Sequence, residues 1–293
     1  MPSWRTIRVP ASSANLGPGF DALGLALGVY LECRFRPSDQ LAIRVSGLDA
    51  GMIPTGPENL IYKITKRTQA PPFELEIDNR IPIGKGLGSS AAAVVAGVVI
   101  GAELTDSKWD RTQVLDQAAR IEGHPDNVAA CVLGGLVSAA IDCTGTVRAV
   151  RHSLHPDYGV GVVVPDFVLP TEQSRLVLPE SYSRDDAIFN LQRAALLVSA
   201  LTTGASDAFP AALDDRLHQP YRLALVPGLD EILGLRAPGL LGCALSGAGP
   251  SVLVFHQRGH QQVCELVQQI FEQHGRSAEI LHPGVPDQGY ELL

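Results

Sequence analysis

The segment PIGKGLGSSAAA, residues 82–93, is the stretch from which the fold prediction starts. Gly84, Gly86 and Gly88 alternate with larger residues, and two serines then open a run of alanines. This order favours a glycine loop that leads into a helix over about 89–104. Glycines let successive backbone N–H groups point at one place, and the start of a helix adds its positive end. Such a loop binds phosphate oxygens, whereas the plainer alternative is an ordinary loop with a serine cap.

Two better-known phosphate loops do not match this segment. A Walker A loop needs GxxxxGK followed by Ser or Thr, and the lone lysine here, Lys85, comes before the last glycine. The dinucleotide spacing GxGxxG does not fit glycines at intervals of two. Residues 17–22 fit GxGxxA formally, but no pattern typical of a helix start follows them, so we interpret that match as accidental.

The patterns on either side of the loop predict layers of strands and helices. Phe73, Leu75 and Ile77 alternate with acidic residues, as in a half-buried strand over 73–78. The other predicted strands are 5–9, 30–35, 41–45, 136–141, 159–164, 242–246, 251–256 and 278–281, and the other predicted helices are 107–122, 185–201 and 261–274. Because strands and helices do not alternate strictly, we predict an α+β fold with two domains, over residues 1–152 and 153–293.

Composition narrows the function classes. The chain has 293 residues, of which 45% are hydrophobic and 18% charged, as in ordinary folded proteins. A net charge of −8 without any basic run argues against a nucleic-acid binder. The five scattered cysteines, with no CxxC pair, indicate buried thiols in a reducing compartment. Residues 1–15 lack a signal-peptide core and the apolar run 91–102 is too short for a membrane span, so we expect a cytoplasmic protein with no membrane partner.

Two further segments are rich in glycine and polar residues. PASSANLGPGFDALGLAL, residues 10–27, sets Asn15 and Asp21 among glycines and apolar residues. In the plainer interpretation Asn15 forms a turn and Asp21 is a surface charge. In the functional one, a rigid loop presents the Asn15 amide and the Asp21 carboxylate to a cleft. LSGAGPSVLVF, residues 245–255, predicts a tight turn between two strands, which is either a plain hairpin or part of the same site.

Taken in order, the three segments resemble the signature motifs of the GHMP kinases, the superfamily of galactokinase, homoserine kinase, mevalonate kinase and phosphomevalonate kinase. Residues 10–27 are similar to the N-termini of the homoserine kinase branch, and EGHPDN (122–127), TEQSR (171–175) and PYR (220–222) agree with it. The resemblance runs from residue 7 to about residue 256. It implies an N-terminal domain like the second domain of ribosomal protein S5 and a ferredoxin-like C-terminal domain. It also implies phosphorylation of the homoserine hydroxyl to O-phosphohomoserine, in threonine biosynthesis, with ATP and Mg²⁺.

The resemblance further implies which residues bind ATP and the metal. The predicted ATP-binding residues are Pro82, Gly84, Lys85, Gly86, Leu87, Gly88, Ser89, Ser90 and Ala91, with Asn59 near the adenine. Ser90 and Glu122 are the predicted Mg²⁺ ligands.

Homoserine carries a carboxylate, an ammonium and a primary hydroxyl, and the predicted pocket offers groups for each. Arg175 and Arg222 can pair with the carboxylate in a bidentate fork, and Asp21 supplies the opposite charge for the ammonium. The remaining predicted substrate-binding residues are Asn15, His124, Asp126, Asn127 and Thr171. The alternative, without the resemblance, is that the two arginines are surface charges and that His124 is a residue at the end of a helix.

Asn15, Glu122 and Asn127 are the predicted catalytic residues. An amide cannot act as a general base, so either Asp21 or Asp126 takes the proton or no base is used. The alternatives at the level of function are a kinase of another small alcohol and a non-catalytic protein that kept the fold. The two arginines and the acidic residue favour an amino acid over a sugar, and the intact loop and Glu122 argue against loss of catalysis. We expect homoserine as the small-molecule partner and a homodimer.

Overall fold

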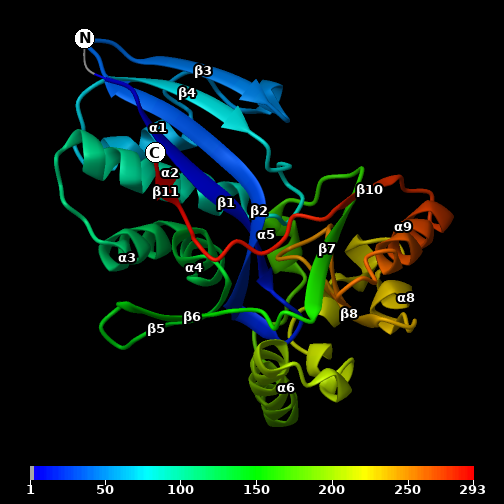
Figure 1. Cartoon of the computed structure of the whole chain (residues 1–293). Helices are drawn as coiled ribbons and strands as arrows, with labels where there is room; N and C mark the ends of the chain where they lie inside the picture. The colour runs from blue at the N-terminus through cyan, green and yellow to red at the C-terminus, as the bar shows by residue number, and fades with distance from the viewer. Residues whose placement is uncertain (1–2) are drawn as a thin grey trace.

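The computed structural model describes residues 3–293 and contains two β-sheets that lie side by side, with helices packed on them (Figure 1). In this part of the chain the first sheet has the order β11-β1-β2-β4-β3, with β5 beside β2 and β6 beside β5. Its strands are β1 (Arg5–Asn15), β2 (Gly19–Pro37), β3 (Ala42–Gly47), β4 (Phe73–Asn79), β5 (Leu136–Ile141), β6 (Val147–His152) and β11 (Glu291–Leu292).

The second sheet has the order β10-β7-β9-β8 and is antiparallel throughout. Its strands are β7 (Tyr158–Pro165), β8 (Leu240–Leu245), β9 (Val252–Gln257) and β10 (Ala278–Leu281). If these strands are numbered along the chain, their order in the sheet is 4-1-3-2. Helix α9 (Val263–Gln273) lies between β9 and β10 in the chain. That is the arrangement of a ferredoxin-like domain, as predicted.

Helix α2 (Ser89–Leu104) forms the centre of the first half and confirms the helix predicted after the glycine loop. Its residues are apolar on all sides, and eleven of the sixteen are buried. At Gly97 an added Cβ would lie 2.8 Å from the Ile64 side chain of α1 (Leu60–Arg67), so only glycine permits this close helix contact. The packing holds the first turn of α2, and with it Ser89 and Ser90, in a fixed position.

Some predicted elements have different bounds, for local physical reasons. The predicted strands 5–9 and 30–35 are parts of the longer β1 and β2, which a turn at 16–18 joins directly. The match to GxGxxA at 17–22 is accidental, since β2 and no helix follows it. The predicted helix 107–122 begins at Arg111, because Asp110 and Gln113 form a capping box in front of it.

The sequence analysis did not assign several short elements. They are α1, β6, α4 (Asp126–Leu133), α5 (Thr171–Leu176), α7 (Gln219–Arg222) and α8 (Leu229–Gly234). The longer helices α3 (Arg111–Glu122) and α6 (Arg184–Thr203) were predicted. Helices of four to eight residues span at most about two turns, which is too little for a clear period in the sequence.

The end of the chain returns to the first sheet. β11 pairs antiparallel with β1, and the Leu293 N–H donates to the Thr6 carbonyl (2.8 Å). The division predicted at residue 152 remains a prediction, and the fold adds that the last residues pack with the first half.

No helix within residues 3–293 has the length and apolarity needed to cross a membrane. Four of the five free cysteines are buried, whereas Cys143 is exposed, contrary to the prediction of buried thiols.

Candidate active site

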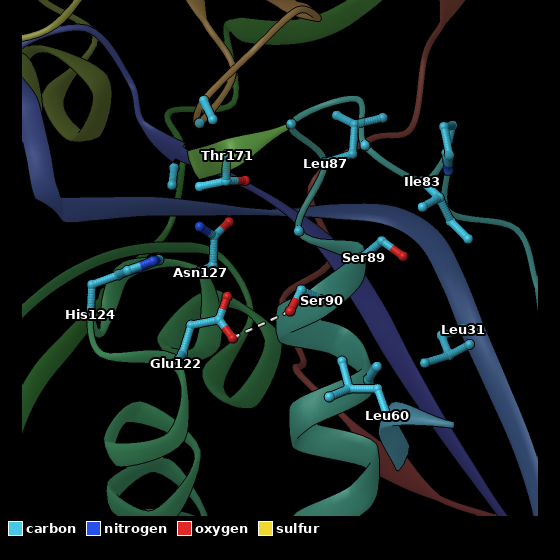
Figure 2. A pocket seen from close by; sticks show the side chains of 18 of the residues that line it. Leu31, Leu60, Ile83, Leu87, Ser89, Ser90, Glu122, His124, Asn127 and Thr171 are labelled. Atoms are coloured by element: carbon cyan, nitrogen blue, oxygen red, sulfur yellow. Dashed lines mark hydrogen bonds between the residues drawn. The ribbon is translucent and has the colours of Figure 1, made fainter. Parts of the chain in front are cut away.

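A cavity of about 400 Å³ lies where the glycine loop, the β1–β2 turn and the start of α4 meet α5 and α7. Figure 2 shows Glu122, His124 and Asn127 on one side of this cavity and Leu31 and Leu60 on another, with Ser89 and Ser90 between them. The predicted site residues that line it are Asn15, Asp21, Asn59, Pro82, Gly84, Gly86, Leu87, Gly88, Ser89, Ser90, Glu122, His124, Asp126, Asn127, Thr171, Arg175 and Arg222. The structure thus brings residues from both halves of the chain to one place.

The shape of the glycine loop depends on close contacts that no side chain would permit. Gly86 and Gly88 have φ angles of +76° and +66°, in the left-handed region. An added Cβ at Gly86 would lie 2.2 Å from the Ser246 carbonyl oxygen, and one at Gly88 would lie 2.0 Å from the Ser12 hydroxyl. The Ser246 hydroxyl also donates to the Gly86 carbonyl (2.7 Å). The turn at 245–251 therefore supports the glycine loop directly, which favours the functional interpretation of that turn over a plain hairpin.

Two predicted ATP-binding residues, Lys85 and Ala91, do not line the cavity. The Lys85 ammonium donates to the carbonyls of Pro165 (2.7 Å) and Phe167 (2.8 Å), and so ties the loop to the second half of the chain. Ala91 is buried inside α2. We therefore leave both residues out of the proposed phosphate contacts.

The two predicted metal ligands lie together at the ends of α2 and α3. The Ser90 hydroxyl lies 3.5 Å from Glu122 Oε2, and the two residues point toward each other in Figure 2. Burial raises the pKa of Glu122, partly offset by the positive charge of His124. A carboxylate and a hydroxyl are hard oxygen donors of the kind that Mg²⁺ prefers, and a cation would relieve the cost of burying the carboxylate. These residues fit a magnesium ion.

A second acidic cluster lies beside this pair. Asp21, His124 and Asp126 have potential ligand atoms within 4.8 Å of one another. However, His124 Nδ1 already lies 2.7 Å from Asp126 Oδ1, which also accepts from the Asn127 N–H. Burial lowers the pKa of His124, but the hydrogen bond to Asp126 and the nearby carboxylates outweigh it and the net shift is upward. The cluster is therefore negatively charged and internally paired, which suits a bound ammonium better than a second metal.

Asn15 and Asn127 differ in how many of their side-chain hydrogen-bonding groups are already used. The Asn15 amide donates to the Gly247 carbonyl (2.9 Å) and accepts from the Asp21 N–H (3.0 Å), so it holds the β1–β2 turn against the second half. Asn127 accepts from the Ser12 hydroxyl (2.8 Å), and its amide nitrogen has no hydrogen-bond partner within residues 3–293. Asn127 is thus free to donate into the cavity, whereas Asn15 acts mainly on the shape of the turn.

The two predicted carboxylate-binding arginines are held differently. Arg175 pairs with Asp21 through both terminal nitrogens, at 2.8 and 3.3 Å. Arg222 is almost fully buried, and burial together with the charge of Arg175 lowers its pKa to about 10. It donates from Nε to the Ser174 carbonyl and from Nη1 to the Gly247 carbonyl and His218. Only Nη2 remains, so the bidentate fork predicted for Arg222 is not available in this arrangement.

The other end of the cavity is apolar. Leu31, Ile53, Leu60 and Ile83 line it, close to Asn59. The Asn59 side chain accepts from the Tyr62 N–H (3.2 Å) and donates to the Pro54 carbonyl (2.8 Å), so it caps α1 and shapes the pocket. The sequence analysis missed these apolar residues and also Phe20, which lines the polar end. The one available signal for Phe20 was its position between Asn15 and Asp21.

Comparisons with known proteins show which family this chain resembles. The family model "GHMP kinases N terminal domain" matches residues 59–135, and "GHMP kinases C terminal" matches residues 197–273. The homoserine kinase of Solibacter usitatus is 62% identical over 99% of this chain and 97% of its own length. That of Deinococcus radiodurans is 48% identical over 87% of this chain and 85% of its own. Among solved structures, the homoserine kinase of Cytophaga hutchinsonii superposes with a TM-score of 0.87 at 26% identity, covering 100% of this chain and 98% of the other.

Proposed function

The chain belongs to the GHMP kinase family, in its homoserine kinase branch, and on this basis we propose that its cavity holds ATP and homoserine for direct transfer of the γ-phosphoryl group to the side-chain hydroxyl. The observation that carries the proposal is the convergence of three kinds of groups in one cavity. These are the amides of the glycine loop, the acidic cluster with Glu122, and the two arginines.

The glycine loop and the start of α2 bind the phosphates of ATP in this proposal. Gly86, Gly88 and the first turn of α2 present backbone N–H groups, which need no side chain to approach an anion. The apolar residues around Leu60 suit the adenine ring, since they exclude water from its faces. The positive end of α2 also stabilises the charge that develops on the leaving ADP.

Ser90 and Glu122 would hold Mg²⁺, which neutralises charge on the β- and γ-phosphates when it is bound. Without the ion, Glu122 is a carboxylate whose burial makes ionisation costly. Its position at the end of α3, facing Ser90 on α2, places it beside the phosphate loop.

The polar end of the cavity binds the amino-acid part of homoserine. The acidic cluster of Asp21, His124 and Asp126 faces the ammonium, and the free Nη2 of Arg222 binds the carboxylate together with Arg175. A bound carboxylate competes with Asp21 for Arg175, and a bound ammonium competes with Arg175 for Asp21. Homoserine thus replaces one ion pair by two, so each of its charged groups gains a partner of opposite charge.

The transfer itself depends mainly on positioning. Phosphoryl transfer has a loose transition state, and holding the two reactants in line supplies much of the rate. Asn127 can donate a hydrogen bond to the reacting oxygens but cannot remove a proton. With homoserine bound, Asp21 would pair with the substrate ammonium, and Asp126 is engaged by His124 and the Asn127 N–H. This engagement of both carboxylates supports transfer without a dedicated general base.

We further propose that the protein forms a homodimer through α6. Ile188 and Leu191 are 41% and 72% exposed on this helix, which projects from the rest of the molecule in Figure 1. Large apolar side chains that share an exposed helix face are typical of interfaces. Replacing Leu191 with Glu should convert a dimer to a monomer in light scattering, whereas an unchanged mass would exclude α6.

The first experiment is ADP release with ATP and Mg²⁺ on homoserine, serine, mevalonate and galactose. We expect strong turnover with homoserine alone. Turnover with another alcohol would retain the phosphate site and discard the substrate pocket, and no turnover with any of them would contradict the proposal as a whole.

A further inference from the structure

His218, a histidine that the sequence analysis did not assign, contacts Arg222, which lines the cavity. It is fully buried and stands four residues before Arg222, at the start of α7. Its Nε2 lies 2.7 Å from the Gly17 carbonyl oxygen, and its Nδ1 lies 3.0 Å from Arg222 Nη1. A carbonyl only accepts and a guanidinium only donates, so Nε2 must carry the proton and Nδ1 must accept. The geometry therefore requires a neutral imidazole in one tautomer.

His218 completes a set of contacts that fixes the Arg222 guanidinium. The Ser174 carbonyl accepts from Nε at 3.1 Å, and the Gly247 carbonyl shares Nη1 with His218, also at 3.1 Å. Three of the five N–H groups of Arg222 are thus used, and within residues 3–293 only Nη2 has no hydrogen-bond partner. The two carbonyls accept from different nitrogens of the guanidinium, and within residues 3–293 His218 provides its one side-chain acceptor.

Phe20 and Asp215 hold the imidazole itself. The ring of Phe20 stacks on His218 with centroids 5.3 Å apart and an interplanar angle of 22°. The guanidinium carbons of Arg175 and Arg222 lie 5.6 and 5.7 Å from the same Phe20 ring. The Asp215 carboxylate accepts from the backbone N–H groups of His218 (2.9 Å) and Gln219 (2.6 Å), which anchors the start of α7. The imidazole consequently has one orientation.

We propose that neutral His218 is a positioning residue that directs Arg222 Nη2 at the substrate carboxylate. This inference depends on the proposed role of Arg222. The charged groups that face the imidazole are Asp215 from the preceding loop, Arg222 from α7 and Asp21 from β2. A protonated His218 would lose the acceptor at Nδ1 and place a second cation against Arg222. Burial, more than any of these charges, lowers the pKa of His218, which keeps the ring neutral near pH 7.

The test compares three variants in steady-state kinetics. His218→Leu removes the acceptor, whereas His218→Asn places an amide oxygen as many bonds from Cα as Nδ1 and retains it. His256→Leu is the matched control, because His256 is also buried but its Nδ1 lies against the Gln257 carbonyl and not against Arg222. For His218→Leu we expect a KM for homoserine raised about 10-fold or more, with kcat and the KM for ATP within about 3-fold of wild type. His218→Asn should recover most of the affinity, and His256→Leu should leave all three constants unchanged.

A truncated substrate and the pH dependence separate positioning from a merely structural role. 3-Aminopropan-1-ol lacks the carboxylate, so its KM should not respond to His218→Leu. As pH is lowered below the ordinary histidine range, the wild-type KM for homoserine should rise more steeply than that of His218→Asn, which has no imidazole to protonate. This comparison stands even if His218→Leu does not fold. Equal losses for both substrates, or parallel pH curves for wild type and His218→Asn, would overturn the inference. An Arg222→Leu variant with unchanged homoserine KM would instead contradict the proposed role of Arg222.

Discussion

The carboxylate of Asp21 and the guanidinium of Arg175 lie 2.8 Å apart across the cavity, on strand β2 and helix α5. These are the two groups that we assign to the ammonium and the carboxylate of homoserine, and without substrate they neutralise each other. The side chains of Arg175 and Asp21 are 40% and 34% exposed, so the pair adds little to stability. Its importance lies in specificity, because a ligand must supply both charges to replace it.

Asp21→Asn tests this relationship with a matched pair of substrates. 4-Hydroxybutyrate is homoserine without the ammonium. We expect kcat/KM for homoserine to fall about 10- to 100-fold in the variant, since a charged hydrogen bond is lost, and kcat/KM for 4-hydroxybutyrate to change little. A similar fall for both substrates in initial-rate assays would show that Asp21 acts on the shape of the turn and not on the ammonium.

Glu122→Gln should lower activity and raise stability at the same time. Glu122 is half-buried, and a carboxylate with a raised pKa binds its proton more tightly in the folded than in the unfolded chain. Stability is therefore lost as pH rises from the ordinary carboxylate range through the raised pKa, and the uncharged amide avoids that loss. We expect Tm without Mg²⁺ at pH 7 to increase by roughly 1–3 °C, while kcat falls at least 10-fold at low Mg²⁺.

Glu103→Gln is the control for that experiment. Glu103 forms an ion pair with Arg5 at 2.6 Å and does not line the cavity. Its variant should not gain stability and should keep the wild-type dependence on Mg²⁺. If Glu122→Gln behaves in the same way as this control, Glu122 is not a metal ligand.

The apparent affinity for Mg²⁺ should depend on pH through Glu122. Protons and the cation compete for the same carboxylate, and burial places this competition at higher pH than for an exposed glutamate. We expect the Mg²⁺ concentration at half-maximal rate to rise as pH is lowered through the raised pKa, measured with saturating homoserine. In Glu122→Gln the same titration should be flat, and a slope equal to that of wild type would assign the effect to another group.

Gly88→Ala should disrupt the phosphate loop more than the backbone conformation alone predicts. Gly88 and Gly145 both have positive φ, at +66° and +79°, so alanine costs about 1–2 kcal/mol at either position. Only Gly88 has a neighbour in the way, since its Cβ would lie 2.0 Å from the Ser12 hydroxyl, while Gly145 has open space. We expect the KM for ATP to rise about 10-fold or more in Gly88→Ala and to stay unchanged in Gly145→Ala. Equal effects of the two substitutions on ATP would mean that backbone strain and not the Ser12 contact is responsible.

Much of the fold was predictable because its signals are local. The alternation of Phe73, Leu75 and Ile77 predicted β4, and the alanine-rich run after Ser90 predicted α2 with its observed bounds. The motif at 82–93 predicted a phosphate loop because glycines in series carry that information without any partner. The short helices α5 and α7 carried no such signal, although they bring Arg175 and Arg222 to the cavity.

The sequence by itself determined the family, the long elements and most residues that line the cavity. Only the tertiary structure decided what those residues do there. It turned Lys85 toward two carbonyls and paired Asp21 with Arg175. Such pairings join segments up to 154 residues apart, and they depend on which donor meets which acceptor after the two halves pack. Local sequence patterns specify the conformation of a segment, whereas the free donors and acceptors of a site are those that distant segments leave unpaired.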